Sequence, residues 1–127
     1  MMGEQFDSSR PIYAQLVERL KARILAGTYP PGGHLESVRD LAAAAGVNPN
    51  TMQRALAQLE MEGLVRTERT SGRFVTEDTD LIEQLRAAAA HEIAKEFLKK
   101  MNSIGYTPEK AAALLEHWDA KEEEQHE

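Results

Sequence analysis

The sequence predicts a mainly α-helical fold with one small β-hairpin, and three observations support this prediction. Two helix-start signals, at Ser37 and Asn48, lie close together on either side of Gly46. Two short runs that are typical of strands flank a turn at residues 70–72. After residue 80, apolar side chains recur at roughly every fourth position, which is typical of an amphipathic helix.

The N-terminal part predicts an arm, one helix and a connector. Residues 1–9 show no periodicity, and we expect them to form a mobile arm. A helix is expected to begin at Pro11 and to end at Gly27, with a buried side made of Ile12, Leu16, Val17, Leu20 and Ile24. The prolines and glycines of residues 28–33 then predict a rigid connector.

Two further helices are predicted with a tight turn between them. Ser37 and Asp40 form an S-x-x-D capping box, and the short helix that it opens carries the apolar residues Leu41, Ala42 and Ala45. Gly46 is expected to end this helix. Asn48 is a preferred N-cap and Pro49 a preferred first residue of the next helix. The two helices must therefore meet at a sharp angle, as in a helix-turn-helix.

The helix after Asn48 carries two stripes that point in opposite directions. The apolar stripe follows the spacing i, i+3, i+4, i+7 and consists of Met52, Ala55, Leu56 and Leu59. The second stripe is displaced by about 200° and consists of Asn50, Gln53, Arg54 and Ala57. We expect the second stripe to face outward and Gly63 to end the helix at its C′ position.

A β-hairpin is predicted directly after this helix. Residues 64–68 and 73–77 read as two short strands around the Thr70, Ser71 and Gly72 turn. A helix-turn-helix followed by a hairpin is a winged helix. The sequence therefore predicts a winged helix-turn-helix domain over residues 10–77.

The C-terminal segment, residues 78–127, predicts two amphipathic helices. The first covers residues 81–101, Gly105 interrupts it, and Thr107 and Pro108 start the second. Two such helices cannot bury both apolar stripes as a unit of about 45 residues, so they need a partner. The simplest partner is a second copy of the chain, and the expected interface of this homodimer consists of Leu81, Leu85, Ala89, Ile93, Phe97, Met101, Leu114, Leu115 and Trp118.

Charge is divided unevenly along the 127 residues, whose formal net charge is −6. Residues 1–77 hold nine basic and nine acidic residues, whereas the tail holds six and twelve. The front part therefore leaves room for a local basic surface that attracts phosphates. No apolar run is long enough to span a membrane, and the polar start is not a signal peptide, so a cytoplasmic protein without membrane contact is expected.

Catalysis, metal binding and cofactors are not predicted. The chain has no cysteine, which excludes disulfides and thiolate sites, and it shows no nucleophile with a base and no phosphate-binding glycine loop. The four histidines have no metal-site spacing. A loose cation site at His117, Asp119, Glu123 and His126 is less favoured than a solvated charged terminus. We expect no enzyme and no metal.

The outward stripe of the helix after Asn48 carries side-chain types that read DNA bases. Asn and Gln match adenine and Arg matches guanine, each by two hydrogen bonds, so Asn50, Gln53 and Arg54 are expected to contact base edges in the major groove. The side chains expected to contact phosphates are those of Ser37, Arg39, Asn48 and Thr51. In the hairpin, the expected contacts to the backbone or minor groove are Arg69, Gly72 and Arg73.

Over residues 10–77 the chain resembles the GntR family of bacterial transcription regulators, and within it the YtrA-type branch. The residues that carry the resemblance are Pro11 to Tyr13, Gln15, Leu16, Pro31, Gly32, Leu35, Ser37 to Arg39, Leu41, Ala42, Gly46 to Thr51, Gln53 to Ala55, Leu59, Glu62 to Leu64, Gly72, Phe74 and Val75. The resemblance implies a homodimeric repressor on a palindromic operator of double-stranded DNA, often controlling its own operon beside transporter genes.

Two departures from the family pattern affect the expected DNA contacts. Glu36 stands where the family usually has proline, which places a carboxylate near the expected phosphates and should weaken binding slightly. Thr70, Ser71, Gly72 and Arg73 replace the usual glycine, basic residue, glycine and threonine of the wing. The positive charge has therefore moved along the hairpin, to Arg69 and Arg73.

Alternative interpretations stay open. Arg39 and Arg54 could be surface residues paired with Asp40 or Glu60, and Asn48 could serve only as a cap. Core or dimer packing is the favoured role of Phe97, Tyr106 and Trp118, although they could line a pocket for an unknown small-molecule effector. As a whole, the chain could instead be a winged-helix adaptor that binds another protein and not duplex DNA.

Overall fold

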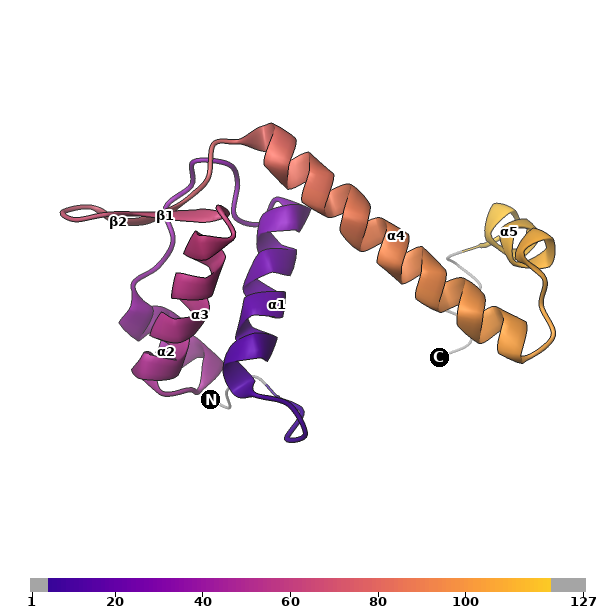
Figure 1. Cartoon of the computed structure of the whole chain (residues 1–127), viewed down its shortest axis with the longest axis horizontal. Helices are drawn as coiled ribbons and strands as arrows, with labels where there is room; N and C mark the ends of the chain where they lie inside the picture. The colour runs from indigo at the N-terminus through magenta and orange to yellow at the C-terminus, as the bar shows by residue number, and fades with distance from the viewer. Residues whose placement is uncertain (1–4, 120–127) are drawn as a thin grey trace. The chain divides into compact units, whose positions relative to one another are not determined.

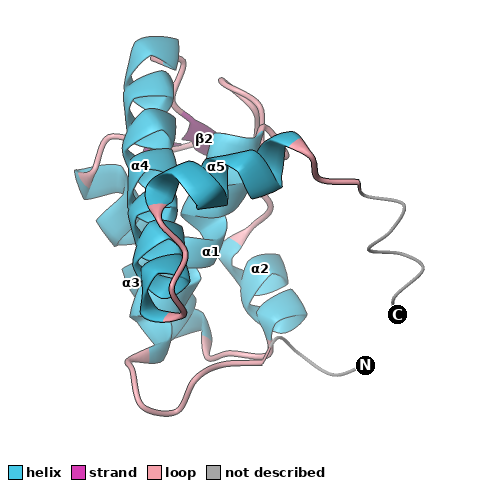
Figure 2. Cartoon of the chain, turned by 90° about the vertical axis from the view of Figure 1, so that its right-hand side faces the viewer, coloured by secondary structure: helices cyan, strands magenta, loops and turns pink. Residues whose placement is uncertain are grey.

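The computed structural model describes residues 5–119. Helices make up most of this range, and the only strands among the described residues form one hairpin (Figure 2). The elements, in chain order, are α1 (Ile12–Ala26), α2 (Val38–Ala45), α3 (Pro49–Met61), β1 (Val65–Glu68), β2 (Gly72–Val75), α4 (Thr79–Ser103) and α5 (Pro108–Glu116). Residue contacts divide the chain into two units, the first ending at Arg86 and the second beginning at Ala87, so the division falls within α4.

The predicted starts and ends of the first three helices are confirmed. The Ser37 hydroxyl accepts a hydrogen bond from the Asp40 N–H at 3.1 Å, and the Asn48 side chain accepts one from the Asn50 N–H at 2.7 Å. Both α2 and α3 end next to a glycine in the left-handed conformation, Gly46 at φ 72° and Gly63 at φ 82°. These local signals fix the turn between α2 and α3.

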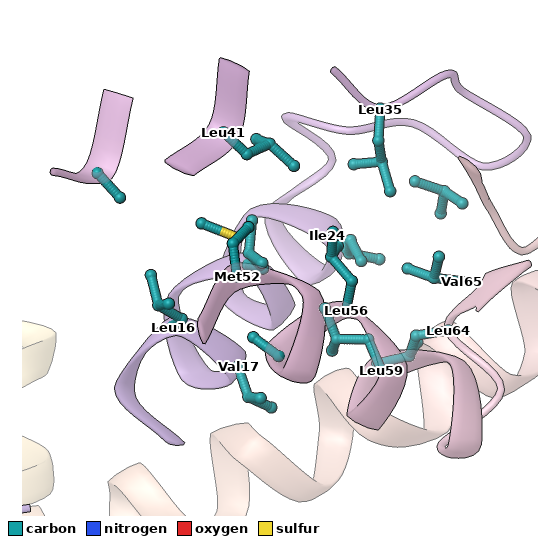
Figure 3. Close-up of a cluster of buried hydrophobic side chains, with 14 of the residues drawn as sticks. Leu16, Val17, Ile24, Leu35, Leu41, Met52, Leu56, Leu59, Leu64 and Val65 are labelled. Carbon is teal, nitrogen blue, oxygen red and sulfur yellow. The ribbon is translucent and has the colours of Figure 1, made fainter. Parts of the chain in front are cut away.

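One hydrophobic core holds the first unit together. Helix α3 packs against both α1 and α2, and the hairpin extends from the end of α3 (Figure 1). Figure 3 shows side chains of α1 and α3 meeting in this core, with residues from α2, β1 and the loop before α2 around them. The largest fully buried side chains are Leu16, Ile24, Met52, Leu56, Leu59, Leu64 and Val75.

The hairpin has a third, short partner that the sequence did not predict. Strands β1 and β2 pair antiparallel, with Val65 opposite Val75 and Glu68 opposite Gly72. Residues 33–35, assigned to a connector and loop, also bond to β2: the Leu35 N–H donates to the Arg73 carbonyl and the Val75 N–H to the Gly33 carbonyl, both at 2.9 Å. An isolated antiparallel bridge between His34 and Phe74 thus joins this segment to the base of the two-stranded wing.

Residues 5–9, part of the arm that the lack of periodicity predicted to be mobile, contact α1. The buried Gln15 side chain accepts a hydrogen bond from the Asp7 N–H at 2.8 Å and donates to the carbonyls of Asp7 and Arg10. The Arg19 guanidinium lies over the Phe6 ring, 4.2 Å from its centroid. The buried side-chain amide of Gln15 therefore anchors this segment to α1. Such a contact leaves no periodic pattern in the sequence.

The first turns of α4 belong to the first unit. Ile82 is buried in the core and Leu85 packs against it. The Arg86 Nε donates to the Leu25 carbonyl at 2.9 Å. The winged helix therefore includes residues beyond the hairpin.

In the second unit, the rest of α4 is followed by a glycine turn and α5. Gly105 has φ 92°, and the Thr107 hydroxyl caps α5 by accepting from the Lys110 N–H at 3.2 Å. Ala111 is buried, but the large apolar side chains of Ile93, Leu115 and Trp118 are more than half exposed. None of the described helices is both long and apolar enough to cross a membrane.

Candidate nucleic-acid interface

The two stripes of α3 face opposite ways, as their spacing predicted. Met52 is 1% exposed and Leu56 is fully buried, whereas the side chains of Asn50, Gln53 and Arg54 are exposed. The apolar stripe is held by α1 and α2, so α3 has little freedom to rotate about its axis. A row of amide and guanidinium groups consequently stands on a fixed surface.

Arg54 rests on an aromatic ring from another helix. Its Cζ atom lies 3.7 Å from the centroid of the Tyr13 ring, which α1 supplies from its first turn. Neither Asp40 nor Glu60 forms an ion pair with Arg54 among the described residues, and Glu60 instead accepts from the Thr67 hydroxyl at 3.1 Å. Pairing with Asp40 or Glu60, the alternative for a surface arginine, is therefore not found.

An open hollow of ≈ 430 Å³ lies between the start of α1 and the first turns of α3. Two of the three expected base-reading residues line it, beside residues that the sequence analysis assigned to the helix start. The lining consists of Pro11, Ile12, Tyr13, Asn50, Thr51 and Arg54. The exposed start of α1 therefore forms part of the same surface as the outward stripe of α3.

The residues expected to contact phosphates gather at two helix N-termini. The side-chain oxygens of Ser37 and Asn48 already accept the cap hydrogen bonds. The donors left for phosphate oxygens are therefore the Ser37 hydroxyl hydrogen, the Asn48 amide hydrogens and the nearby backbone N–H groups. Arg39 is exposed and has no ion pair among residues 5–119, whereas Thr51 is half-buried. Anions are favoured at such helix ends.

Glu36 is held in place by a tyrosine. The Tyr29 hydroxyl donates to the Glu36 carboxylate at 2.8 Å. Burial and this hydrogen bond together raise the pKa of Tyr29 above its ordinary value. The carboxylate thus stays anchored just before the cap of α2, next to the expected phosphate contacts.

One face of the wing carries three side chains in contact, with the His34 and Phe74 rings tilted by 52° to each other. The Phe74 ring lies 4.8 Å from the His34 ring, between centroids, and the Arg66 guanidinium carbon lies 4.8 Å from the Phe74 centroid. The His34 ring nitrogen Nε2 is 2.8 Å from the Ser71 carbonyl oxygen. Through these contacts His34 braces the turn that ends at Gly72.

The expected DNA-contacting residues of the wing differ in their surroundings. Arg69 and Gly72 are exposed at the turn, but Arg73 is half-buried and its Nε has no hydrogen-bond partner among the described residues. Glu68 accepts hydrogen bonds from the Ser71 hydroxyl and from Arg66, and these lower its pKa. The Glu68 carboxylate therefore belongs to the residue directly before Arg69, the arginine at the turn of the wing.

Sequence reasoning missed two residues of this surface, Tyr13 and His34. Tyr13 entered only through the family resemblance, and His34 was considered only as one of the four histidines that lack metal-site spacing. Both act through contacts with residues far away in the sequence, so no local pattern marks them. A tyrosine facing an outward arginine becomes visible only once α1 and α3 are packed together.

The residues expected at the dimer interface fall into two groups. Leu85 packs against the core of the first unit, and Leu81 lies close to Gly63, so both have partners within their own chain. In the second unit, Phe97, Met101 and Ala89 are half-buried, and Trp118 lies beyond the end of α5. The exposed members are Ile93, Leu114, Leu115 and Trp118.

No group of three His, Cys, Asp or Glu side chains within residues 5–119 is placed to hold a metal ion. Glu123 and His126, two members of the loose cation site weighed above, lie outside the described residues. The charged terminus, residues 121–127, lies there as well.

Comparisons with known proteins agree on one family. The model of the bacterial regulatory proteins of the gntR family matches residues 12–75. The chain is 37% identical over 108 residues to the uncharacterized HTH-type transcriptional regulator YhcF of Bacillus subtilis (strain 168), a match that covers 85% of this chain and 89% of that protein. It is 42% identical over 78 residues to the HTH-type transcriptional repressor YtrA of the same bacterium, covering 60% of each.

Solved structures support the same conclusion. A GntR family transcriptional regulator from Listeria monocytogenes has a TM-score of 0.80 and 40% identity, over 90% of this chain and 100% of that one. The DNA-binding domain of AraR, solved in complex with operator ORR3, has a TM-score of 0.52 and 28% identity, over 60% of this chain and 89% of that one. The resemblance to YtrA-like regulators and the winged helix are thus confirmed, and the chain belongs to the gntR family of bacterial regulatory proteins as a helix-turn-helix transcription regulator.

Proposed function

We propose that this regulator acts in the cytoplasm as a homodimeric repressor that binds a palindromic operator in double-stranded DNA. The observation that carries the proposal is the row of exposed side chains on α3, Asn50, Gln53 and Arg54, standing opposite a fully packed apolar stripe. Each good bidentate pair with a base contributes about 1 to 3 kcal/mol of discrimination. Three such side chains on a fixed helix are sufficient to set a sequence preference.

Phosphate contacts supply the remaining affinity in this proposal. Arg39 and the N-termini of α2 and α3 hold the backbone of one strand, and Arg69, Gly72 and Arg73 let the wing follow it. Such contacts carry no sequence information but fix the register of α3 in the groove. They make binding weaken steeply as salt rises.

A dimer is proposed because one winged helix is small and the second unit exposes apolar side chains. A specific complex usually covers about 1,000 to 2,500 Å² of protein surface, more than one such module supplies. Ile93, Leu115 and Trp118 are 70%, 56% and 54% exposed in the single chain. A second copy that covers them doubles the footprint, and its two-fold symmetry calls for two half-sites about one helical turn, or a multiple of it, apart.

Repression is proposed from the relatives. YtrA is described as a repressor, and the AraR domain was solved bound to operators. A dimer that covers a promoter-proximal site blocks RNA polymerase by occupying the same DNA, and control of its own operon is the arrangement that the family resemblance implies.

Selection of bound fragments from random duplex DNA by the full chain tests the proposal. We expect one palindromic sequence, with affinity that falls strongly between 50 and 200 mM salt, on the order of 10³-fold or more if six phosphates are neutralised. Arg39→Ala should weaken all duplexes alike, whereas Arg54→Ala should relax the preference at one base pair in each half-site. Absence of duplex binding at low salt would refute the proposal and favour the protein-binding adaptor.

A further inference from the structure

An aromatic contact joins the start of α1 to the outward face of α3. Tyr13 is half-buried, and its ring centroid lies 3.7 Å from the Cζ atom of the exposed Arg54. Cation–π contacts act within about 6 Å, so this pair is close. Among the described residues no carboxylate pairs with Arg54, which leaves the Tyr13 ring as the group that orients the guanidinium.

Stacking of this kind leaves the hydrogen-bonding edge of an arginine available. The ring occupies one face of the planar guanidinium, while the N–H donors lie in its plane and point outward along its edge. Recognition of guanine uses that edge, with two parallel hydrogen bonds to O6 and N7. An ionic partner would instead compete for the same donors.

Holding the side chain in advance also changes the free energy of binding. A free arginine loses rotamer freedom when it is fixed on a base, and this loss opposes binding. A guanidinium that already rests on a ring has less freedom to lose. The hollow that Tyr13 and Arg54 share with Asn50 and Thr51 shows that the contact lies on the surface that faces DNA in the proposed function.

We propose that Tyr13 is a positioning residue for base recognition. Its ring holds Arg54 so that the guanidinium edge meets one base pair, and α1 thereby contributes to sequence preference without touching a base. The inference rests on the proposed function, because it requires α3 to lie in the major groove.

The test compares full-chain variants on duplexes that carry the operator selected by the unmodified chain. The base pair read by Arg54 is the one at which Arg54→Ala relaxes the preference, and each variant is measured on that operator and on its three substitutions there. Tyr13→Leu should reduce the preference about two- to five-fold, the effect of an exposed cation–π contact. Tyr13→Phe keeps the ring and should retain the preference, and Tyr13→Leu added to Arg54→Ala should reduce it no further.

Three results would overturn the inference. If Tyr13→Leu keeps the full preference while Arg54→Ala relaxes it, Tyr13 does not position Arg54 and the proposed function still stands. If Tyr13→Leu and Tyr13→Phe weaken all duplexes alike, the tyrosine hydroxyl contacts a phosphate instead. If Arg54→Ala relaxes no position, the base-reading role of Arg54 fails as well. Tyr13→Met serves as a second ring-free variant should Tyr13→Leu not fold, as judged by thermal unfolding.

Discussion

At the scale of single residues, the surface around the cap of α2 combines a favourable and an unfavourable charge. Arg39 is exposed and unpaired among residues 5–119, while the Glu36 carboxylate is anchored by Tyr29 beside the same helix end. The anchored carboxylate repels any phosphate that Arg39 attracts. Glu36 should therefore limit affinity without affecting which sequence is bound.

Glu36→Gln tests this directly. The amide oxygen can still accept from the Tyr29 hydroxyl, so the substitution removes charge and little else. We expect all duplexes to be bound more tightly by about 0.2 to 1 kcal/mol, with a smaller gain at high salt. Glu36→Asp keeps the charge and is the control; an equal gain from both variants would show that the charge is not responsible. Titrations of duplex DNA by fluorescence anisotropy provide the measurement.

At the scale of elements, the wing depends on the contact between His34 and its turn. Gly72 has φ 100°, and a Cβ atom there would lie 2.9 Å from His34 Nε2. An alanine at this position is therefore strained, and it also pushes His34 off the Ser71 carbonyl. The geometry of the wing turn thus depends on Gly72 and on His34, which comes from the loop before α2.

Gly72→Ala and Gly27→Ala form a matched pair. Gly27 also has positive φ, at 85°, but no atom lies within 4 Å of its added Cβ. Gly27→Ala should cost about 1 to 2 kcal/mol of unfolding free energy from the backbone alone. Gly72→Ala should cost about 0.5 to 1.5 kcal/mol more through the lost hydrogen bond. Equal losses in urea unfolding would show that His34 does not brace the turn.

An ion pair also links α1 to the C-terminal end of α3. Lys21 of α1 lies 2.6 Å from the Glu62 carboxylate, and the Gln58 amide donates to the same carboxylate at 3.0 Å. Burial would raise the pKa of Glu62, but the hydrogen bonds from Lys21 and Gln58 outweigh it and lower the pKa. A lowered folded pKa means that the stabilisation is present above the ordinary value of 4.5 and is lost as pH falls through the folded pKa.

Glu62→Gln should therefore destabilise the winged helix at pH 7 and have little effect in acid. Because both side chains are about a third exposed, we expect a loss of only about 0.5 kcal/mol at pH 7. This difference should vanish as pH falls through the folded pKa of Glu62, which lies below the ordinary value of 4.5. Glu116→Gln, at the exposed end of α5, is the control for a general charge effect. A difference that persists at low pH would contradict the ion-pair explanation.

At the scale of the whole molecule, the proposed function requires two chains to associate, because one winged helix alone covers too little DNA for a specific complex. Leu115→Glu and Ile93→Glu place charges on the apolar surface of the second unit and should give monomers, because a buried unpaired charge is costly. Met61→Glu, at a residue 82% exposed in the first unit, is the control and should stay dimeric. Analytical ultracentrifugation would measure the mass. Variants that remain dimers would show that the interface lies elsewhere.

The sequence predicted the winged helix well because its signals are local. The caps at Ser37 and Asn48 and the breaks at Gly46 and Gly63 act within a few residues, so they can be read without a structure. The pairing of residues 33–35 with β2 and the contact of Tyr13 with Arg54 join distant segments and leave no periodic trace.

Periodicity also does not tell which partner covers an apolar face. The stripe of α4 was assigned as a whole to a dimer, yet Leu85 packs on the core of its own winged helix. Likewise, Trp118 follows the apolar spacing of Leu114 and Leu115 and was predicted to share their side of the helix. In the structure, however, α5 ends at Glu116, before Trp118. Whether an apolar helix face is covered by its own chain or by a second copy depends on tertiary packing. The spacing of apolar residues along the sequence does not contain this information.

The central claim is that the outward face of α3 carries the sequence preference, and one selection experiment tests it most directly. The full chain with Asn50, Gln53 and Arg54 all replaced by alanine keeps the apolar stripe, the caps and Arg39, so it should fold and still bind DNA in a salt-dependent way. Selection from random duplexes should then yield no common sequence. Recovery of the same operator as the unmodified chain would contradict the claim.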